Sequence, residues 1–141
     1  ETILIGGTEF GAFIVPFDGV QNRNDWLELK PLQKSNDPLN IICSRSYKID
    51  KHIDEIYSHL PHGRCAYIRK GSALKFFDLA LGKADVYPRF APTMEWDIAA
   101  GQAILEALGG SVIDINTNEP LTYNKESLFN PPFIAKTNVV G

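Results

Sequence analysis

Short apolar runs separated by turn residues predict a series of β-strands. Thr2–Ile5 and Ala12–Val15 are apolar or β-branched runs on either side of Gly6-Gly7, which predicts a hairpin. Gln21–Asn40 is polar, contains two prolines, and is expected to be a surface excursion rather than a linker between domains. Further strands are predicted at 39–43, 65–69, 84–87, 111–115 and 133–135, with a return strand at 121–123 left open.

Three segments between these strands have the apolar spacing of helices. Asp50–Leu60 places apolar residues three or four apart, and Pro61 follows it. The second helix is expected to begin after Ser72 as N-cap and to end at Gly82, and the third to span Asp97–Leu108 and end at Gly109-Gly110. Because strands and helices alternate through the middle of the chain, we predict an α/β fold with a central, mostly parallel sheet flanked by helices.

Composition narrows the class of protein. The chain has 141 residues, enough for one domain with its own core, and 44% of them are hydrophobic. The net charge of −3 does not favour nucleic-acid binding, and no apolar run is long enough to cross a bilayer. Cys43 and Cys65 form no CxxC motif, and we expect both thiols to be reduced in the cytoplasm.

Three polar clusters follow predicted strands. They are Ser44–Tyr47, Gly71-Ser72 with Lys75, and Tyr87–Arg89 followed by Trp96-Asp97. If the strands are parallel, all three clusters lie at the carboxyl edge of one sheet, where ligands bind in open α/β folds. Helix N-termini and two basic side chains there favour an anionic, phosphorylated small molecule.

Asp97 does not fit a site for an anion alone. A carboxylate beside a phosphate is repelled unless a cation lies between them, and Mg²⁺ prefers carboxylate and phosphate oxygens. A single aspartate is too few for a catalytic metal site, and capping of the helix is the alternative role for it. Trp96 is expected to pack beside the site, and the three histidines, which lack metal-ligand spacing, are expected to lie in solvated loops.

The run WDIAAGQAILEALGG, residues 96–110, resembles the C-terminal signature of the inositol monophosphatase superfamily of Mg²⁺-dependent phosphatases. SRSY, GSALKF, YPRFAPT and NEPLTYNKESLFNPPF are similar to the CysQ-type 3′(2′),5′-bisphosphate nucleotidases of that superfamily. The resemblance extends from Ile3 to Ile134. It implies the C-terminal half of the layered fold shared by inositol monophosphatases and fructose bisphosphatases, and hydrolysis of 3′-phosphoadenosine 5′-phosphate to AMP and phosphate during sulfate assimilation.

Site residues follow from the resemblance by position. Asp97 corresponds to a metal-binding aspartate of the family, with a catalytic role between metal and phosphate. Ser72, Lys75 and Arg89 fall where such nucleotidases contact the nucleotide and its second phosphate. Tyr47 stands where the family often has histidine, so its contact with substrate is a weaker inference.

The family's upstream glutamate and its Asp-Pro-x-Asp-Gly-Thr loop have no match in the chain. Asp18-Gly19 is the only Asp-Gly pair, and it lacks the flanking residues. Residues 1–141 are therefore expected to be a C-terminal substrate-binding domain, inactive alone, whose N-terminal partner domain supplies most ligands for two or more Mg²⁺ ions.

Two other functions stay open. The first alternative to the nucleotidase is an inositol or sugar monophosphatase, and the second is a nucleotide-binding module without turnover. Lys75 and Arg89 distinguish the nucleotidase from the monophosphatase, because they would serve a second phosphate. A phosphorylated nucleotide is the expected partner, with no nucleic acid and no transmembrane segment. A homodimer and a peripheral association with the cytoplasmic face of the inner membrane also stay open.

Overall fold

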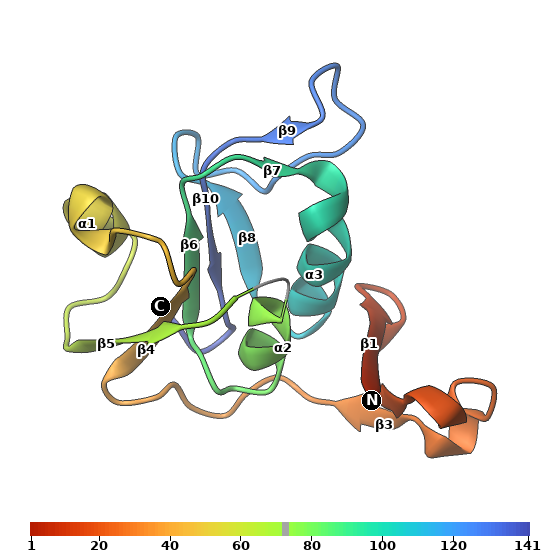
Figure 1. Ribbon diagram of the computed structural model, residues 1–141. Helices are drawn as coiled ribbons and strands as arrows, with labels where there is room; N and C mark the ends of the chain where they lie inside the picture. Colours follow the sequence, from red (N-terminus) through yellow and green to blue (C-terminus); the bar gives the residue numbers. More distant parts are fainter. Residues whose placement is uncertain (72–73) are drawn as a thin grey trace.

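A mixed five-stranded sheet forms the centre of the structure, a computed structural model that describes residues 1–71 and 74–141 (Figure 1). Its strand order is β5-β4-β6-β10-β8. β4 is parallel to both β5 and β6, whereas β10 runs antiparallel to β6 and β8. Four of the five strands therefore point the same way, as predicted. The bounds of these strands are β4 Leu39–Cys43, β5 Cys65–Arg69, β6 Val86–Arg89, β8 Ser111–Asp114 and β10 Phe133–Lys136.

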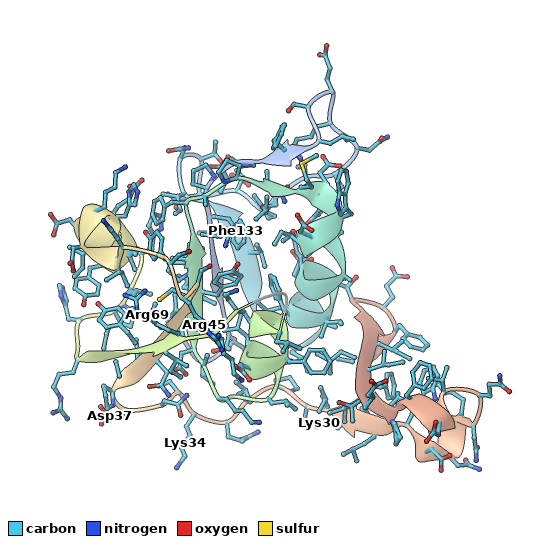
Figure 2. All side chains as sticks on the ribbon, in the orientation of Figure 1. Lys30, Lys34, Asp37, Arg45, Arg69 and Phe133 are labelled. Atoms are coloured by element: carbon cyan, nitrogen blue, oxygen red, sulfur yellow. The ribbon has the colours of Figure 1, made fainter. Side chains whose placement is uncertain are left out.

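Alternate residues of the central strands enter two separate cores, one on each face of the sheet. Phe133, labelled in Figure 2, packs with Tyr87 and Ile98 on the face covered by α2 (Lys75–Ala80) and α3 (Glu95–Ala107). The neighbouring positions on the same strands face the other way. There Ile41, Val86 and Ile134 pack against residues of a 3₁₀ turn, Ile49–His52, and of α1, Ile53–Ser58. This period of two is what a strand buried on both faces requires.

A small antiparallel sheet at the N-terminal end stands beside α3, away from the central sheet (Figure 1). It contains β1 Thr2–Gly7, β2 Gly11–Pro16 and β3 Leu27–Leu29. Leu4 and Ala12 pack against Ile104 of α3. The predicted hairpin is confirmed, but the chain reverses at residues 8–10 rather than at Gly6-Gly7.

The predicted surface excursion at 21–40 contains one short strand that the sequence pattern did not indicate. β3 lies inside it and pairs with β2, with Leu27 exposed and Leu29 half-buried. The predicted end of a strand at Pro88 was wrong, since Pro88 lies inside β6 opposite Ile134. It is one residue from the strand end, and its restricted φ fits extended backbone.

The segment 116–130 connects β8 to the last strand. The return strand left open at 121–123 is reduced to a single bridge between Ile113 and Pro120. Two residues of the connection, β9 (Phe129–Asn130), pair with β7 (Thr93–Met94), which directly precedes α3 in the sequence. This pairing holds the loop before α3 against the end of the molecule that carries the site described below.

The two glycines predicted to end helices have that role. Gly82 and Gly109 adopt left-handed backbone at φ +76° and +82°, where they end α2 and α3. Gly101 allows α2 and α3 to approach closely, because a Cβ there would lie 2.5 Å from the ring of Phe76. Cys43 and Cys65 are both free. No helix among the described residues is long and apolar enough to cross a membrane.

Asp85, immediately before β6, is fully buried and joins β6 to β4 and to the segment before β4. Its carboxylate accepts hydrogen bonds from the backbone N–H groups of Asn36 (3.0 Å) and Asn40 (2.8 Å), and from the side-chain amide of Asn36 (2.9 Å). Its own N–H donates to the carbonyl of Asn40 at 2.9 Å. The side chain therefore sets the relative position of two parallel strands at their amino ends.

Replacing Asp85 with alanine is expected to destabilise the protein by about 3 kcal/mol or more, because several donors lose a charged acceptor that water cannot easily replace. Asp18→Ala is the matched control, since Asp18 is exposed, and it should change stability by less than about 0.5 kcal/mol. Equilibrium unfolding in urea measures both. A loss below about 1 kcal/mol for Asp85→Ala would show that the register of β4 and β6 does not depend on this carboxylate.

Candidate functional site

A pocket of about 280 Å³ opens at the carboxyl ends of β4 and β6, next to the first residues of α2 and α3. Its polar lining combines all three clusters that the sequence placed at strand ends: Ser44, Lys75, Tyr87, Arg89, Thr93 and Asp97. The parallel pairing of β4 with β6 is the reason, because it brings their carboxyl ends to one edge of the sheet. Lys75, Arg89 and Asp97, predicted together, lie together.

Lys75 is a cation held at the buried wall of this pocket. The residue is only 3% exposed, and its ammonium stands 5.3 Å from the centre of the Tyr87 ring. Burial lowers the pKa of Lys75, and the nearby positive charge of Arg89 lowers it further, while Cys43 opposes the shift. An anion bound in the pocket would favour the charged form of Lys75, which burial disfavours.

Arg89, the last residue of β6, is oriented by one contact with the segment after β4 and one with its own following residues. Nη1 donates a hydrogen bond to Ser44 Oγ at 2.8 Å, and Nε donates to the carbonyl of Ala91 at 3.3 Å. Its charge also opposes the rise in the pKa of Tyr87 that burial causes. A guanidinium held in this way can present parallel donors to a phosphate or carboxylate.

Asp97 is the third residue of α3, not the residue before it. Its Oδ2 accepts a hydrogen bond from the backbone N–H of Met94 at 2.9 Å, so it helps to cap the helix from inside. Its other carboxylate oxygen has no hydrogen-bond partner in the part of the chain that the structure describes. The capping role and a role toward a ligand are therefore compatible, since each uses a different oxygen.

The helix ends contribute less positive potential than the sequence suggested. α2 has only six residues, so its dipole is small. The first N–H groups of α3 are already used, since Met94 donates to Asp97 and Glu95 donates to the carbonyl of Leu128 at 2.9 Å. The attraction for anions therefore comes mainly from the side chains of Lys75 and Arg89.

The donors present fit one ligand of a magnesium ion, not a complete metal site. Asp97 offers a carboxylate oxygen beside the two cations, which is the ligand chemistry that Mg²⁺ prefers. Among residues 1–71 and 74–141, no group of three or more His, Cys, Asp or Glu side chains is arranged to hold a metal ion.

Of the remaining sequence-predicted residues, Tyr47 and Trp96 do not line this pocket, and Ser72 lies outside the described residues. Tyr47 lines a neighbouring pocket, where burial raises its pKa to about 12. Trp96 is 66% exposed, so the expectation that it packs beside the site was wrong, because the third position of α3 and not the second faces the pocket.

Two features of the site were missed by sequence reasoning. Thr93 lines the pocket from β7, and a lone threonine in a loop carries no pattern that would reveal this. His52 was expected in a solvated loop, but its ring stacks on Phe90 at 3.9 Å between centroids. The ring of Tyr47 lies parallel to both, so three side chains from separate segments form one aromatic group.

Comparison with known proteins identifies the family of this chain. The family model described as "Inositol monophosphatase family" matches residues 17–139. The chain belongs to the inositol monophosphatase family. The structural match agrees: CysQ from Bacteroides thetaiotaomicron superimposes with a TM-score of 0.71 at 39% identity, covering 91% of this chain and 51% of that one. The fold of this chain is thus about half of the family fold.

Two further relatives show how much of a complete enzyme of the family this chain covers. The 3′(2′),5′-bisphosphate nucleotidase CysQ of Escherichia coli K12 is 41% identical over 97 residues, which are 68% of this chain and 38% of that protein. An inositol monophosphatase II from Staphylococcus aureus, at 21% identity and a TM-score of 0.63, shares the fold over 98% of this chain and 47% of its own. The chain therefore spans well under two thirds of these enzymes.

The lowered pKa of Lys75 predicts a pH dependence of anion binding. The ammonium attracts an anion only while it is protonated, so affinity for sulfate is present below the Lys75 pKa and is lost as pH rises through it. Because that pKa lies below the ordinary lysine value of 10.5, affinity should begin to fall at a lower pH than it would for an exposed lysine.

Isothermal titration calorimetry with sulfate, which remains a dianion throughout, measures this dependence. Lys75→Met has a similar volume and no titrating group, so it should bind sulfate weakly at pH 8 and lose little more by pH 10. An equal fall in affinity for both proteins would assign the pH dependence to a group other than Lys75.

Proposed function

We propose that residues 1–141 are the substrate-binding half of a Mg²⁺-dependent phosphatase that hydrolyses the 3′-phosphate of 3′-phosphoadenosine 5′-phosphate, releasing AMP and phosphate. The observation that carries the proposal is the arrangement of one carboxylate and two cations around a single pocket at a sheet edge. The similarity to CysQ of two bacteria supports the substrate, and the short coverage of those enzymes supports a further domain. We refer to the longest natural polypeptide that contains this chain as the parent protein.

In this proposal the pocket residues serve two different phosphates of the substrate. Lys75 and Arg89 bind and orient the phosphate that is not cleaved, because they supply two positive charges within one wall of the pocket. Asp97 would offer a carboxylate oxygen to Mg²⁺, which when bound would neutralise charge on the phosphate that is cleaved and favour attack by water.

The bond changes are those of a phosphate monoester hydrolysis. The oxygen of a water molecule bonds to the 3′-phosphorus, the bond between phosphorus and the 3′ oxygen breaks, and the 3′ oxygen gains a proton. Lys75 and Arg89 contribute by holding the nucleotide so that this phosphorus lies in line with the attacking water, which is a positioning effect. Among the described residues that line the pocket, Asp97 is the only carboxylic acid.

Asp97→Asn separates the capping role from the metal role. An asparagine oxygen can still accept the hydrogen bond from Met94, so stability should change by less than about 1 kcal/mol. Loss of the negative charge should lower kcat of the parent protein by about 100-fold or more with Mg²⁺ present. Asp97→Ala is the companion variant, and it should lose both stability and activity.

Thermal unfolding and a phosphate-release assay on the same preparations give the two readouts. If Asp97→Asn keeps both its stability and its turnover, Asp97 is a helix cap and not a metal ligand.

Arg89→Gln distinguishes the bisphosphate substrate from the alternative of an inositol or sugar monophosphate. Removing a charged hydrogen bond to the second phosphate should lower kcat/KM for 3′-phosphoadenosine 5′-phosphate by about 10- to 100-fold. The same change should alter kcat/KM for inositol 1-phosphate much less, since that substrate has no second phosphate.

Steady-state kinetics of the parent protein on both substrates measures the ratio. Arg64→Gln is the charge-matched control, because Arg64 is exposed and does not line the pocket. An equal loss on the two substrates would contradict a second-phosphate role and would favour the monophosphatase.

A further inference from the structure

A second pocket of about 360 Å³ adjoins the first and shares two of its residues, Ser44 and Arg89. It is formed by the segment after β4, the 3₁₀ turn before α1, and the residues that follow β6. Because Arg89 belongs to both walls, a ligand held by its guanidinium in the first pocket can extend into the second without leaving the protein surface.

The lining of this outer pocket is positively charged. Lys48, Lys51 and Arg89 are among the residues that form it, and in the described part of the chain no aspartate or glutamate lines it. Neither lysine ammonium lies within 4.0 Å of a described carboxylate. The acidic residues of the same segment, Asp50, Asp54 and Glu55, do not line this pocket, and Glu55 faces His52 Nδ1 at 3.6 Å.

The remaining wall is aromatic and rigid. The rings of Tyr47, His52 and Phe90 lie within 5° of parallel, and His52 and Phe90 are in direct stacking contact. The hydroxyl of Tyr47 is buried and has no hydrogen-bond partner among the described residues. A pocket with three cations over a packed aromatic wall suits a compact anionic group better than an apolar one.

We propose that Lys48 and Lys51 form an outer anion subsite that favours 3′-phosphorylated nucleoside 5′-diphosphates over the corresponding 5′-monophosphates. This rests on the proposed function, since Lys75 and Arg89 must hold the first phosphate of the 5′ chain. The second phosphate, joined to the first through one bridging oxygen, then reaches the lysines of the adjoining pocket. The outer subsite adds affinity and selects the length of the anionic chain, without a part in the hydrolysis itself.

The test compares the affinities of two probes for the parent protein, without divalent metal and at low ionic strength. They are adenosine 3′,5′-bisphosphate and adenosine 3′-phosphate 5′-diphosphate. Isothermal titration calorimetry should show the diphosphate binding about fivefold more tightly, as expected for one extra phosphate near two partly solvated lysines. Low salt is needed because exposed charges are screened.

The double variant Lys48→Gln, Lys51→Gln should lose this difference and keep its affinity for the bisphosphate within about twofold. The matched control is Lys30→Gln, Lys34→Gln, which removes the same net charge. Both control lysines lie along the segment before β4 and away from Arg45 (Figure 2), and neither lines either pocket. The control should keep the fivefold preference.

The outcomes separate the two proposals. Failure of the parent protein to release phosphate from the bisphosphate when Mg²⁺ is supplied would overturn the proposed function. Normal binding of the bisphosphate with no preference for the diphosphate would overturn the outer subsite alone. Loss of the preference in the control variant as well would assign it to net charge and would also overturn the subsite.

Discussion

The buried carboxylate of Asp85 is the contact on which the arrangement of the site depends. It accepts hydrogen bonds from the segment before β4 and from Asn40 in β4, while its backbone bonds to Asn40 and Thr137 join β6 to β4 and β10. A fully buried charge is costly unless its hydrogen bonds are satisfied, and here they are satisfied by the backbone N–H groups of Asn36 and Asn40 and by the side-chain amide of Asn36. The amino ends of β4 and β6 are thereby fixed.

The carboxyl ends of the same strands are then brought together as a consequence. Ser44 follows β4 and Arg89 ends β6, and the two side chains meet at 2.8 Å. α2 and α3 pack closely on this sheet through Gly101, which brings Lys75 and Asp97 to the same edge. The site is therefore a product of strand register and of one close helix contact, and no separate binding loop is needed to build it.

Sequence reasoning recovered the parts of this account that depend on local pattern or on a long motif. The alternation of strands and helices, the mostly parallel sheet and the grouping of Lys75, Arg89 and Asp97 were all predicted. Patterns failed where tertiary contacts decide. β3 is too short to show a period. Trp96 and Asp97 are both exposed, and only the rotation of α3 decides that Asp97 and not Trp96 lines the pocket. His52 is half-buried by stacking on Phe90, which is far from it in sequence. The outer pocket was missed for the same reason, since its walls come from three segments.

The site contains two cations and one carboxylate, which is enough to hold a phosphorylated ligand but not to assemble a metal cluster among the described residues. The most direct test of this account is the rate of Mg²⁺-dependent phosphate release from 3′-phosphoadenosine 5′-phosphate by the pure 141-residue chain, compared with the parent protein. The account predicts turnover by the parent protein and none by the chain alone. Metal-dependent hydrolysis by the chain alone would contradict it, because the catalytic ligands would then have to lie within these residues.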